Sequence, residues 1–354
     1  MHLMPDIGKI SPGLFDELIS PHLGAKSDKV LVGPQNGVDV GIVEIGDKAV
    51  SLTCDPVFIV PEYGWERAAW FAIHIIASDS VTSGLKPRFL AIDLNLPMEM
   101  TSEQLEMMWK TMHLECVKLG ISVVTGHTGR YENCHYPMVG GATMVGIGNK
   151  DEYVTPRLVR AGDKIIITKG PAIEATGIFA AMFPKLIERE FGKDFSRKAQ
   201  QIFYKMSVVD DAMTAVRVGV RDNGITAMHD ATECGIWGGL YEIAQAADLG
   251  VRVEMESIVV EDCVPDICRY FAIDPYASIS EGTLIISCRE YKAGDVLKAL
   301  HGEGIKASIV GDFTEPRLGM VLIRNGKEEK LEHPIVDPFW RAFYQALEKY
   351  SGKF

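Results

Sequence analysis

The sequence predicts a two-domain protein of mixed α and β structure, and three observations lead to that fold class. The 354 residues correspond to about two domains at the usual size of ~150 residues each. Helix-like and strand-like segments alternate, while neighbouring hairpin-like runs disfavour an all-parallel sheet. A polar segment at 150–162, with a proline and a Gly-Asp turn, separates the two halves. We expect domains at 1–155 and 156–330, followed by a helical tail at 331–354.

The first half is predicted to combine short strands with two long helices. Ser11 and Pro12 are typical of a helix start, and Gly24 of a helix stop. Residues 38–55 contain two β-rich runs joined by Gly46-Asp47, which indicates a hairpin. The further expected elements are a core helix at 65–84, apolar on nearly every side, a strand at 88–97, an amphipathic helix capped by Thr101 at 101–120, a strand at 121–130 that ends in a glycine-rich turn, and a strand at 136–148.

The second half is predicted to begin with a fresh strand, "KIIITKG", at 164–170. A helix over about 172–190 should follow, then further helices up to residue 223. The remaining expected elements are a strand at 225–229, a helix at 236–248, the strand-like run "VRVEME", a helix, strand and helix, the runs "KASIVGDF" and "GMVLIRNG", and a final helix at 339–350.

Composition and charge exclude several classes of protein. Hydrophobic residues make up 47% of the chain and charged residues 24%, as in ordinary globular proteins. A formal charge of -12 argues against nonspecific nucleic-acid binding, although a carboxylate site can bind a phosphate group through a metal ion. No run approaches the ~20 apolar residues of a membrane span, and no signal peptide is evident, so we expect a cytoplasmic protein. Seven cysteines without a CxxC pair indicate reduced, mostly buried thiols.

Single acidic residues recur at the ends of apolar segments or inside them. Asp39 follows the glycine-rich turn "GPQNGVD", Asp55 ends the strand "AVSLTCD", and Asp230 ends "ITAMH". Asp79 interrupts an otherwise apolar helix and is the hardest to explain. One such acid would usually be a helix cap or a turn residue, but a buried carboxylate needs a partner. Four of them make a divalent-cation site about as plausible as a set of caps and turns.

Other candidate sites are weaker. The sequence lacks a P-loop, a GxGxxG turn opening a helix and a GxSxG elbow. "TKGPAIEATG" offers glycines and a helix N-terminus for a phosphate, but a plain strand-to-helix turn explains it equally well. His127, in "TGHTGR", is either a site residue or a surface turn histidine. In "MHDATECG", Thr232 is a plausible helix cap beside Asp230.

Taken in order, these blocks resemble a known family. "VGPQNGVDVGIVEI", "LTCDPV", "ASDSVTSGLKPRFLAIDLNLP", "VVTGHTGR", "RAGDKIIITKG", "MHDATECGIWGGLYEIA" and "ISEGTLIIS" follow the block order of the AIR synthetase (PurM-like) superfamily over residues 8 to 325. Its members include AIR synthetase, HypE, selenophosphate synthetase and thiamine-monophosphate kinase. "TKGPAIEATG" and "AMHDATE" are most similar to HypE-like, AIR synthase-related proteins.

The resemblance implies a PurM-like fold, with an N-terminal dimer-barrel domain and a C-terminal α/β domain. It further implies ATP and Mg²⁺ bound between the domains at a homodimer interface, and activation of a substrate oxygen by phosphoryl transfer. The metal ligands would be Asp39, Asp79 and Asp230. The nucleotide would be lined by Asp55, Gly126, His127 and Thr128, with Lys9 in the place of a family lysine. By position alone, Glu233 and His229 are the candidates for proton transfer.

Some positions depart from the family pattern. HypE carries its carbamoyl group on a C-terminal cysteine, whereas this sequence has no cysteine after Cys288, so we do not expect the specific HypE reaction. Cys234 stands where the family has a glycine, and it is either a nucleophile or, more often for such residues, a packing residue. Two alternatives stay open: a nucleotide-binding assembly factor without turnover, and a small-metabolite kinase. The expected partners are a second copy and either a small-molecule substrate or a maturation protein, without nucleic acid or membrane.

Overall fold

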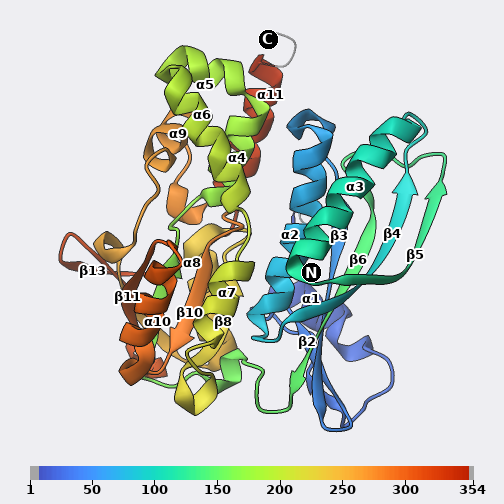
Figure 1. Cartoon of the computed structure of the whole chain (residues 1–354). Helices are drawn as coiled ribbons and strands as arrows, with labels where there is room; N and C mark the ends of the chain where they lie inside the picture. The colour runs from blue at the N-terminus through green and yellow to red at the C-terminus, as the bar shows by residue number, and fades with distance from the viewer. Residues whose placement is uncertain (1–7, 351–354) are drawn as a thin grey trace.

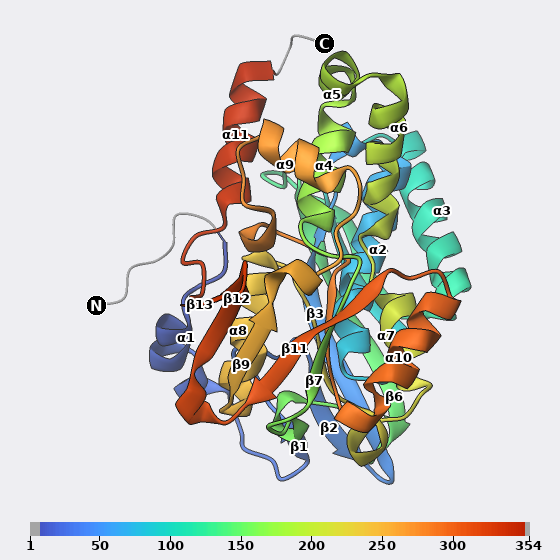
Figure 2. The same cartoon turned by 90° about the vertical axis from the view of Figure 1, so that its left-hand side faces the viewer.

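The computed structural model describes residues 8–350, which form two sheets with helices packed around them (Figures 1 and 2). The strands of the first sheet lie within residues 30–149 and those of the second within 164–330. Mixed α and β structure in two sheets is the predicted fold class, whereas the division at residues 155 and 156 stays a prediction. Within the described range, no helix combines the length and the apolar character that a membrane crossing requires.

The first sheet has six strands in the order β1-β2-β3-β6-β4-β5. The predicted hairpin is confirmed, because β2 and β3 pair antiparallel on either side of Gly46-Asp47. Only β4 and β5 run parallel, so the sheet is mixed as expected. The strands are β1 (Val30–Val32), β2 (Gly41–Ile45), β3 (Lys48–Phe58), β4 (Pro87–Leu96), β5 (Ser122–Arg130) and β6 (Met138–Asn149).

Helix α2 (Trp65–Thr82) is the element that joins the two halves of the molecule. It contacts β3 and β6 of the first sheet and also α7 (Val209–Val216) and β8 (Ile225–Asp230) of the second half. Twelve of its residues are buried, which confirms the predicted core helix. Helix α3 (Ser102–Leu119) packs beside it and starts at a capping box formed by Thr101 and Gln104.

The second sheet has seven strands in the order β13-β12-β9-β11-β7-β10-β8. Helices α7 and α10 (Glu290–Gly302) pack on one face in a core shared with α2, and α8 (Gly235–Ala247) packs on the other face. The strands other than β8 are β7 (Lys164–Thr168), β9 (Gly250–Glu254), β10 (Leu284–Cys288), β11 (Ala307–Thr314), β12 (Met320–Arg324) and β13 (Lys327–Lys330).

A second core of aromatic side chains lies at one end of this half, around Phe179, which stacks on Phe271 with ring centroids 3.8 Å apart. The helices that build it are α4 (Ile173–Met182), α5 (Pro184–Phe191), α6 (Lys193–Ile202), α9 (Val264–Tyr270) and α11 (Pro338–Tyr350). The prediction of one helix over 172–190 is wrong, because Pro184 cannot continue α4 and starts α5 instead.

Two further boundaries differ from expectation. The first helix, α1 (Pro12–Leu18), ends six residues before Gly24 and is followed by a short 3-10 turn at Ser20–His22. The predicted glycine-rich turn after residue 125 is part of β5, which continues to Arg130. Gly126 permits this continuation, since a Cβ atom there would come within 2.1 Å of the Ile92 carbonyl oxygen on β4.

Candidate functional site

Four acidic residues, predicted separately from the sequence, meet where the two halves of the molecule face each other. Asp39 lies in the loop between β1 and β2, Asp55 on β3, Asp79 in α2, and Asp230 at the end of β8. Side-chain oxygen or nitrogen atoms of Asp39, His229 and Asp230 lie within 4.8 Å of one another, so two carboxylates that could bind a metal ion meet at this point beside the imidazole. We call Asp39, Asp55, Asp79 and Asp230 the acid cluster.

Thr53 connects two members of the acid cluster. Its hydroxyl lies 3.0 Å from the carbonyl oxygen of Asp39 and 3.1 Å from Oδ2 of Asp79. Burial, together with the charges of Asp230 and Asp55, raises the pKa of Asp79 well above its usual value. The carboxyls of Asp55 and Asp230 are thus close enough to Asp79 to disfavour its charged form.

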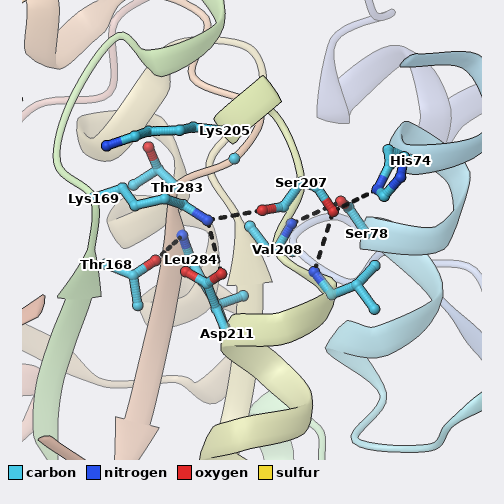
Figure 3. Close-up of polar contacts among 12 residues, drawn as sticks. His74, Ser78, Thr168, Lys169, Lys205, Ser207, Val208, Asp211, Thr283 and Leu284 are labelled. Atoms are coloured by element: carbon cyan, nitrogen blue, oxygen red, sulfur yellow. Dashed lines mark hydrogen bonds and ion pairs between the residues drawn. The ribbon is translucent and has the colours of Figure 1, made fainter. Parts of the chain in front are cut away.

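Polar contacts of Ser78 and His74 fasten α2 to the second half of the chain (Figure 3). Ser78 Oγ accepts a hydrogen bond from the backbone N–H of Val208 at 3.0 Å. One turn earlier, His74 Nδ1 lies 2.8 Å from Ser207 Oγ. Lys169 holds the same loop, with Nζ 2.7 Å from the Ser207 carbonyl oxygen. Contacts on both sides of Ser207 thus set the position of the helical turn that carries Asp79.

Asp230 has the environment that a metal ligand requires. The residue is 1% exposed, and within the described chain neither carboxylate oxygen has a hydrogen-bond partner. Burial and the nearby charge of Asp39 raise the pKa of Asp230 to about 7, although His229 opposes the shift. A carboxylate in this state is costly unless a cation approaches it. Mg²⁺, which prefers carboxylate oxygens, fits this donor set.

His229 bridges two carboxylates. Its Nδ1 lies 2.7 Å from Asp39 Oδ2, and its Nε2 lies 2.8 Å from Glu242 Oε2. Burial alone would lower the pKa of His229, but the two carboxylates outweigh burial and raise it well above its usual value. Both ring nitrogens therefore donate, and the imidazole has no lone pair left for a metal or for accepting a proton.

The N-terminal segment lies against the acid cluster. The backbone N–H of Lys9 donates to Glu233 Oε2 at 3.2 Å. Desolvation opposes the charged form of Lys9, but the carboxylates of Asp39, Glu242, Asp79 and Asp230 raise its pKa above the usual value. The structure thus brings Lys9 and Glu233 near the predicted metal ligands.

Three acidic residues of the site escaped the sequence analysis: Glu174, Glu242 and Glu281. Glu281 is fully buried, and its Oε2 has no hydrogen-bond partner within the described chain. Burial raises the pKa of Glu281 well above its usual value and that of Glu174 to about 8. The sequence signal that could have found two of them is the one used for Asp230, a single acidic residue at the edge of an apolar segment. Glu281 stands alone before the apolar strand "TLIIS", and Glu174 stands alone at the start of an apolar helix.

Cys234 lies beside the acid cluster but has the environment of a packing residue. Its thiol donates to the carbonyl oxygen of Pro334 at 3.1 Å, and burial raises its pKa to about 12. The prediction that Thr232 caps the following helix is wrong, since α8 starts later, at Gly235, with Cys234 as its N-cap. The carboxylate of Asp337 instead accepts a hydrogen bond from the Cys234 backbone N–H at 2.7 Å.

The other predicted nucleotide residues lie elsewhere in the first sheet. Gly126, His127 and Thr128 belong to β5, an edge strand separated by β4 and β6 from the strand that carries Asp55. His127 Nε2 lies 2.6 Å from the hydroxyl of Tyr131, and the two rings stack. Within one chain, residues 126–128 are thus separated by two strands from Asp55, the member of the acid cluster that lies in this sheet.

The turn of "TKGPAIEATG" is occupied by protein contacts. The backbone N–H of Ile173 donates to Ser280 Oγ at 3.0 Å, and that of Ala175 donates to the Ile279 carbonyl oxygen at 3.2 Å. Two of the first three N–H groups of α4 are thus engaged, which favours the plain strand-to-helix turn over a phosphate cradle.

Family profiles match most of the chain. The N-terminal domain of AIR synthase related protein matches residues 37–148, and the C-terminal domain of the same family matches residues 160–323. The chain belongs to the AIR synthase related family. These matches include most strands of both sheets and confirm the resemblance seen in the sequence blocks.

Named relatives connect this chain with hydrogenase maturation proteins. It is 25% identical over 338 residues to a Methanocaldococcus jannaschii protein assigned to hydrogenase expression and formation, covering 94% of this chain and 96% of the relative. It is 24% identical over 296 residues to the carbamoyl dehydratase HypE of Escherichia coli, covering 82% of each. A solved structure of HypE in complex with ATP superposes with a TM-score of 0.64 at 22% identity, covering 94% of this chain and 97% of that one. This similarity establishes the shared PurM-like fold.

Proposed function

We propose that this chain binds ATP with Mg²⁺ at the acid cluster and activates a substrate oxygen by phosphoryl transfer. The observation that carries the proposal is Asp230, which is buried, lacks hydrogen-bond partners at both oxygens and lies beside Asp39 and Asp79. The acid cluster draws its carboxylates from both halves of the chain. A family relative whose structure contains ATP gives the proposal further support.

Asp39, Asp79 and Asp230 would hold the metal. Bound Mg²⁺ would supply charge neutralisation for the triphosphate and for the transferring phosphoryl group. Asp55, which lies close enough to Asp79 to raise the pKa of that carboxyl, would line the same space. Lys9 contributes a positive charge near these carboxylates and fits a role in holding phosphate oxygens.

Glu233 is the better of the two candidates for proton transfer. It is only half-buried, and its Oε2 accepts the Lys9 backbone N–H, so the segment that carries Lys9 also orients this carboxylate. His229, by contrast, has both nitrogens engaged by Asp39 and Glu242. We therefore assign proton transfer to Glu233 and a fixed positive charge to His229.

We also propose that the active form is a homodimer. Exposed apolar side chains occur on four strands of the first sheet: Leu52, Phe89, Val124 and Met138. A second copy would cover this surface and could bring the 126–128 segment of one protomer into the nucleotide site of the other. Size-exclusion chromatography with light scattering should give a dimer at micromolar concentration, and a monomer would contradict this arrangement.

Calorimetry tests the nucleotide site. Wild-type protein should bind ATP in the presence of Mg²⁺, and Asp79→Asn should abolish the binding. Asp248→Asn, at the exposed C-terminal cap of α8, removes the same charge away from the acid cluster and should bind as the wild type does. Unchanged ATP binding by Asp79→Asn would contradict the site assignment.

An ADP-release assay distinguishes an enzyme from a binding protein. ADP should form when candidate acceptors with a carbamoyl, carboxylate or phosphate oxygen are added. ATP binding without ADP formation across such a screen would favour the alternative of an assembly factor. ADP formed only with one small metabolite, which itself becomes phosphorylated, would identify a metabolite kinase.

A further inference from the structure

A chain of alternating imidazole and carboxylate side chains runs from the partly exposed His333 to the acid cluster. His333 Nε2 lies 3.6 Å from Glu242 Oε1, while Glu242 Oε2 accepts from His229 Nε2 at 2.8 Å. His229 Nδ1 in turn donates to Asp39 Oδ2 at 2.7 Å. The side chains become more buried along this chain, with exposed fractions of 34%, 29% and 4% from His333 through Glu242 to His229. Glu242 is therefore the link between the helix α8 and a predicted metal ligand on the opposite domain.

The loop that carries Asp39 also contacts α8 through its backbone. Gly37 has a φ of +72°, and a Cβ atom there would lie 2.5 Å from the carbonyl oxygen of Glu242. Only glycine permits this approach. Two independent contacts, one between backbones and one through His229, thus hold the Asp39 loop on the same turn of α8.

The hydrogen-bonding capacity of imidazole determines what His229 can do here. Each of its nitrogens faces a carboxylate oxygen, so each donates and neither can coordinate a cation. Without the acceptor at Glu242, Nε2–H would have no partner and the ring could turn within its pocket. Asp39 would then lose the donor that fixes its Oδ2.

We propose that Glu242 is a positioning residue for the metal site: it holds His229, which fixes one oxygen of Asp39 and leaves the other oxygen to meet the cation. This inference rests on the proposed function, because it concerns how the metal ligand is oriented. Glu242 would act on the metal site through His229 and Asp39, without serving as a ligand itself. Residues that orient a metal ligand in this way typically account for about 10–100-fold in metal affinity.

Mn²⁺ binding followed by electron paramagnetic resonance tests the proposal without an activity assay. We expect Glu242→Ala to weaken Mn²⁺ binding by about 10–100-fold. Glu242→Gln keeps an oxygen that can accept from Nε2–H and should restore most of the affinity. Asp248→Asn, on the exposed end of the same helix, should bind Mn²⁺ as the wild type does. If Glu242→Ala fails to fold, Glu242→Leu, which keeps the bulk but offers no acceptor, carries the same expectation.

Crystal structures of the metal-free variants provide the second measurement. In Glu242→Ala, the His229 ring and the Asp39 carboxylate should leave their wild-type positions, and in Glu242→Gln they should keep them. Wild-type affinity for Mn²⁺ in Glu242→Ala, or an unchanged Asp39–His229 contact in its structure, would overturn the inference. If wild-type protein binds neither Mn²⁺ nor ATP, the proposed function fails, while the metal-free structures still decide whether Glu242 positions Asp39.

Discussion

Asp230→Asn should stabilise the metal-free protein while removing its response to Mg²⁺. In the folded chain, the pKa of Asp230 is about 7, against an ordinary value of 3.8. This pKa difference of 3.2 corresponds, at ~1.4 kcal/mol per pKa unit, to a cost of about 4 kcal/mol to the free energy of folding. The full cost applies once the pH exceeds 7, where Asp230 is ionised in the folded protein. This is an upper limit for the gain, because the asparagine amide must find its own partners in the same buried position.

The sign of the pH dependence follows from the direction of the shift. A carboxyl whose pKa is raised by folding costs nothing below pH 4, where it is protonated in both states. Its cost grows as the pH rises from about 4 to about 7 and then stays constant. Wild-type protein in a chelator should therefore lose stability over this range, and Asp230→Asn should lose less.

Differential scanning fluorimetry at pH 8 measures both effects. In EDTA, Asp230→Asn should melt a few degrees above wild type, since each kcal/mol corresponds to about 2–4 °C. In Mg²⁺ with ATP, the wild type should gain stability from ligand binding and the variant should not. A lower melting temperature for the variant in EDTA would refute the idea of an unpaired, costly carboxylate. A preserved response to Mg²⁺ would refute its role as a ligand.

Three further predictions concern buried or exposed groups near the site and away from it. Glu174→Gln should raise the melting temperature in EDTA at pH 8 but not at pH 4.5, because burial raises the pKa of Glu174 to about 8 and its cost therefore develops only as the pH rises between these values. In native protein, a thiol reagent should modify the exposed Cys54 rapidly and the buried Cys234 slowly, as peptide mapping can show; rapid labelling of Cys234 would contradict its packing role. Arg289→Ala should destabilise the fold by about 3–5 kcal/mol in urea unfolding, because it leaves the buried Asp163 without the guanidinium that lies 2.8 Å away; a loss below about 1 kcal/mol would show that the pair is dispensable.

Local patterns in the sequence were enough to predict most of the fold. The hairpin at Gly46-Asp47, the core helix around Asp79 and the capped helix after Thr101 all follow from periodicity and turn chemistry, which act over a few residues. Errors arose where a local signal had two meanings. The glycines around His127 indicated a turn, but Gly126 serves the close approach of β5 to β4, and Gly129 lies against the Tyr131 side chain.

The sequence also identified the four aspartates that the structure brings together, because an isolated carboxylate in an apolar segment is costly wherever the segment packs. It could not predict how they are held. His229 and Asp39 are 190 residues apart, and Glu242 reaches the same ring only through the packing of α8 against the end of β8. Only the tertiary structure decided which acids share a site, which imidazole nitrogen each one contacts and which carboxylate oxygens have no partner. These are long-range properties, because the residues involved come from distant parts of the chain.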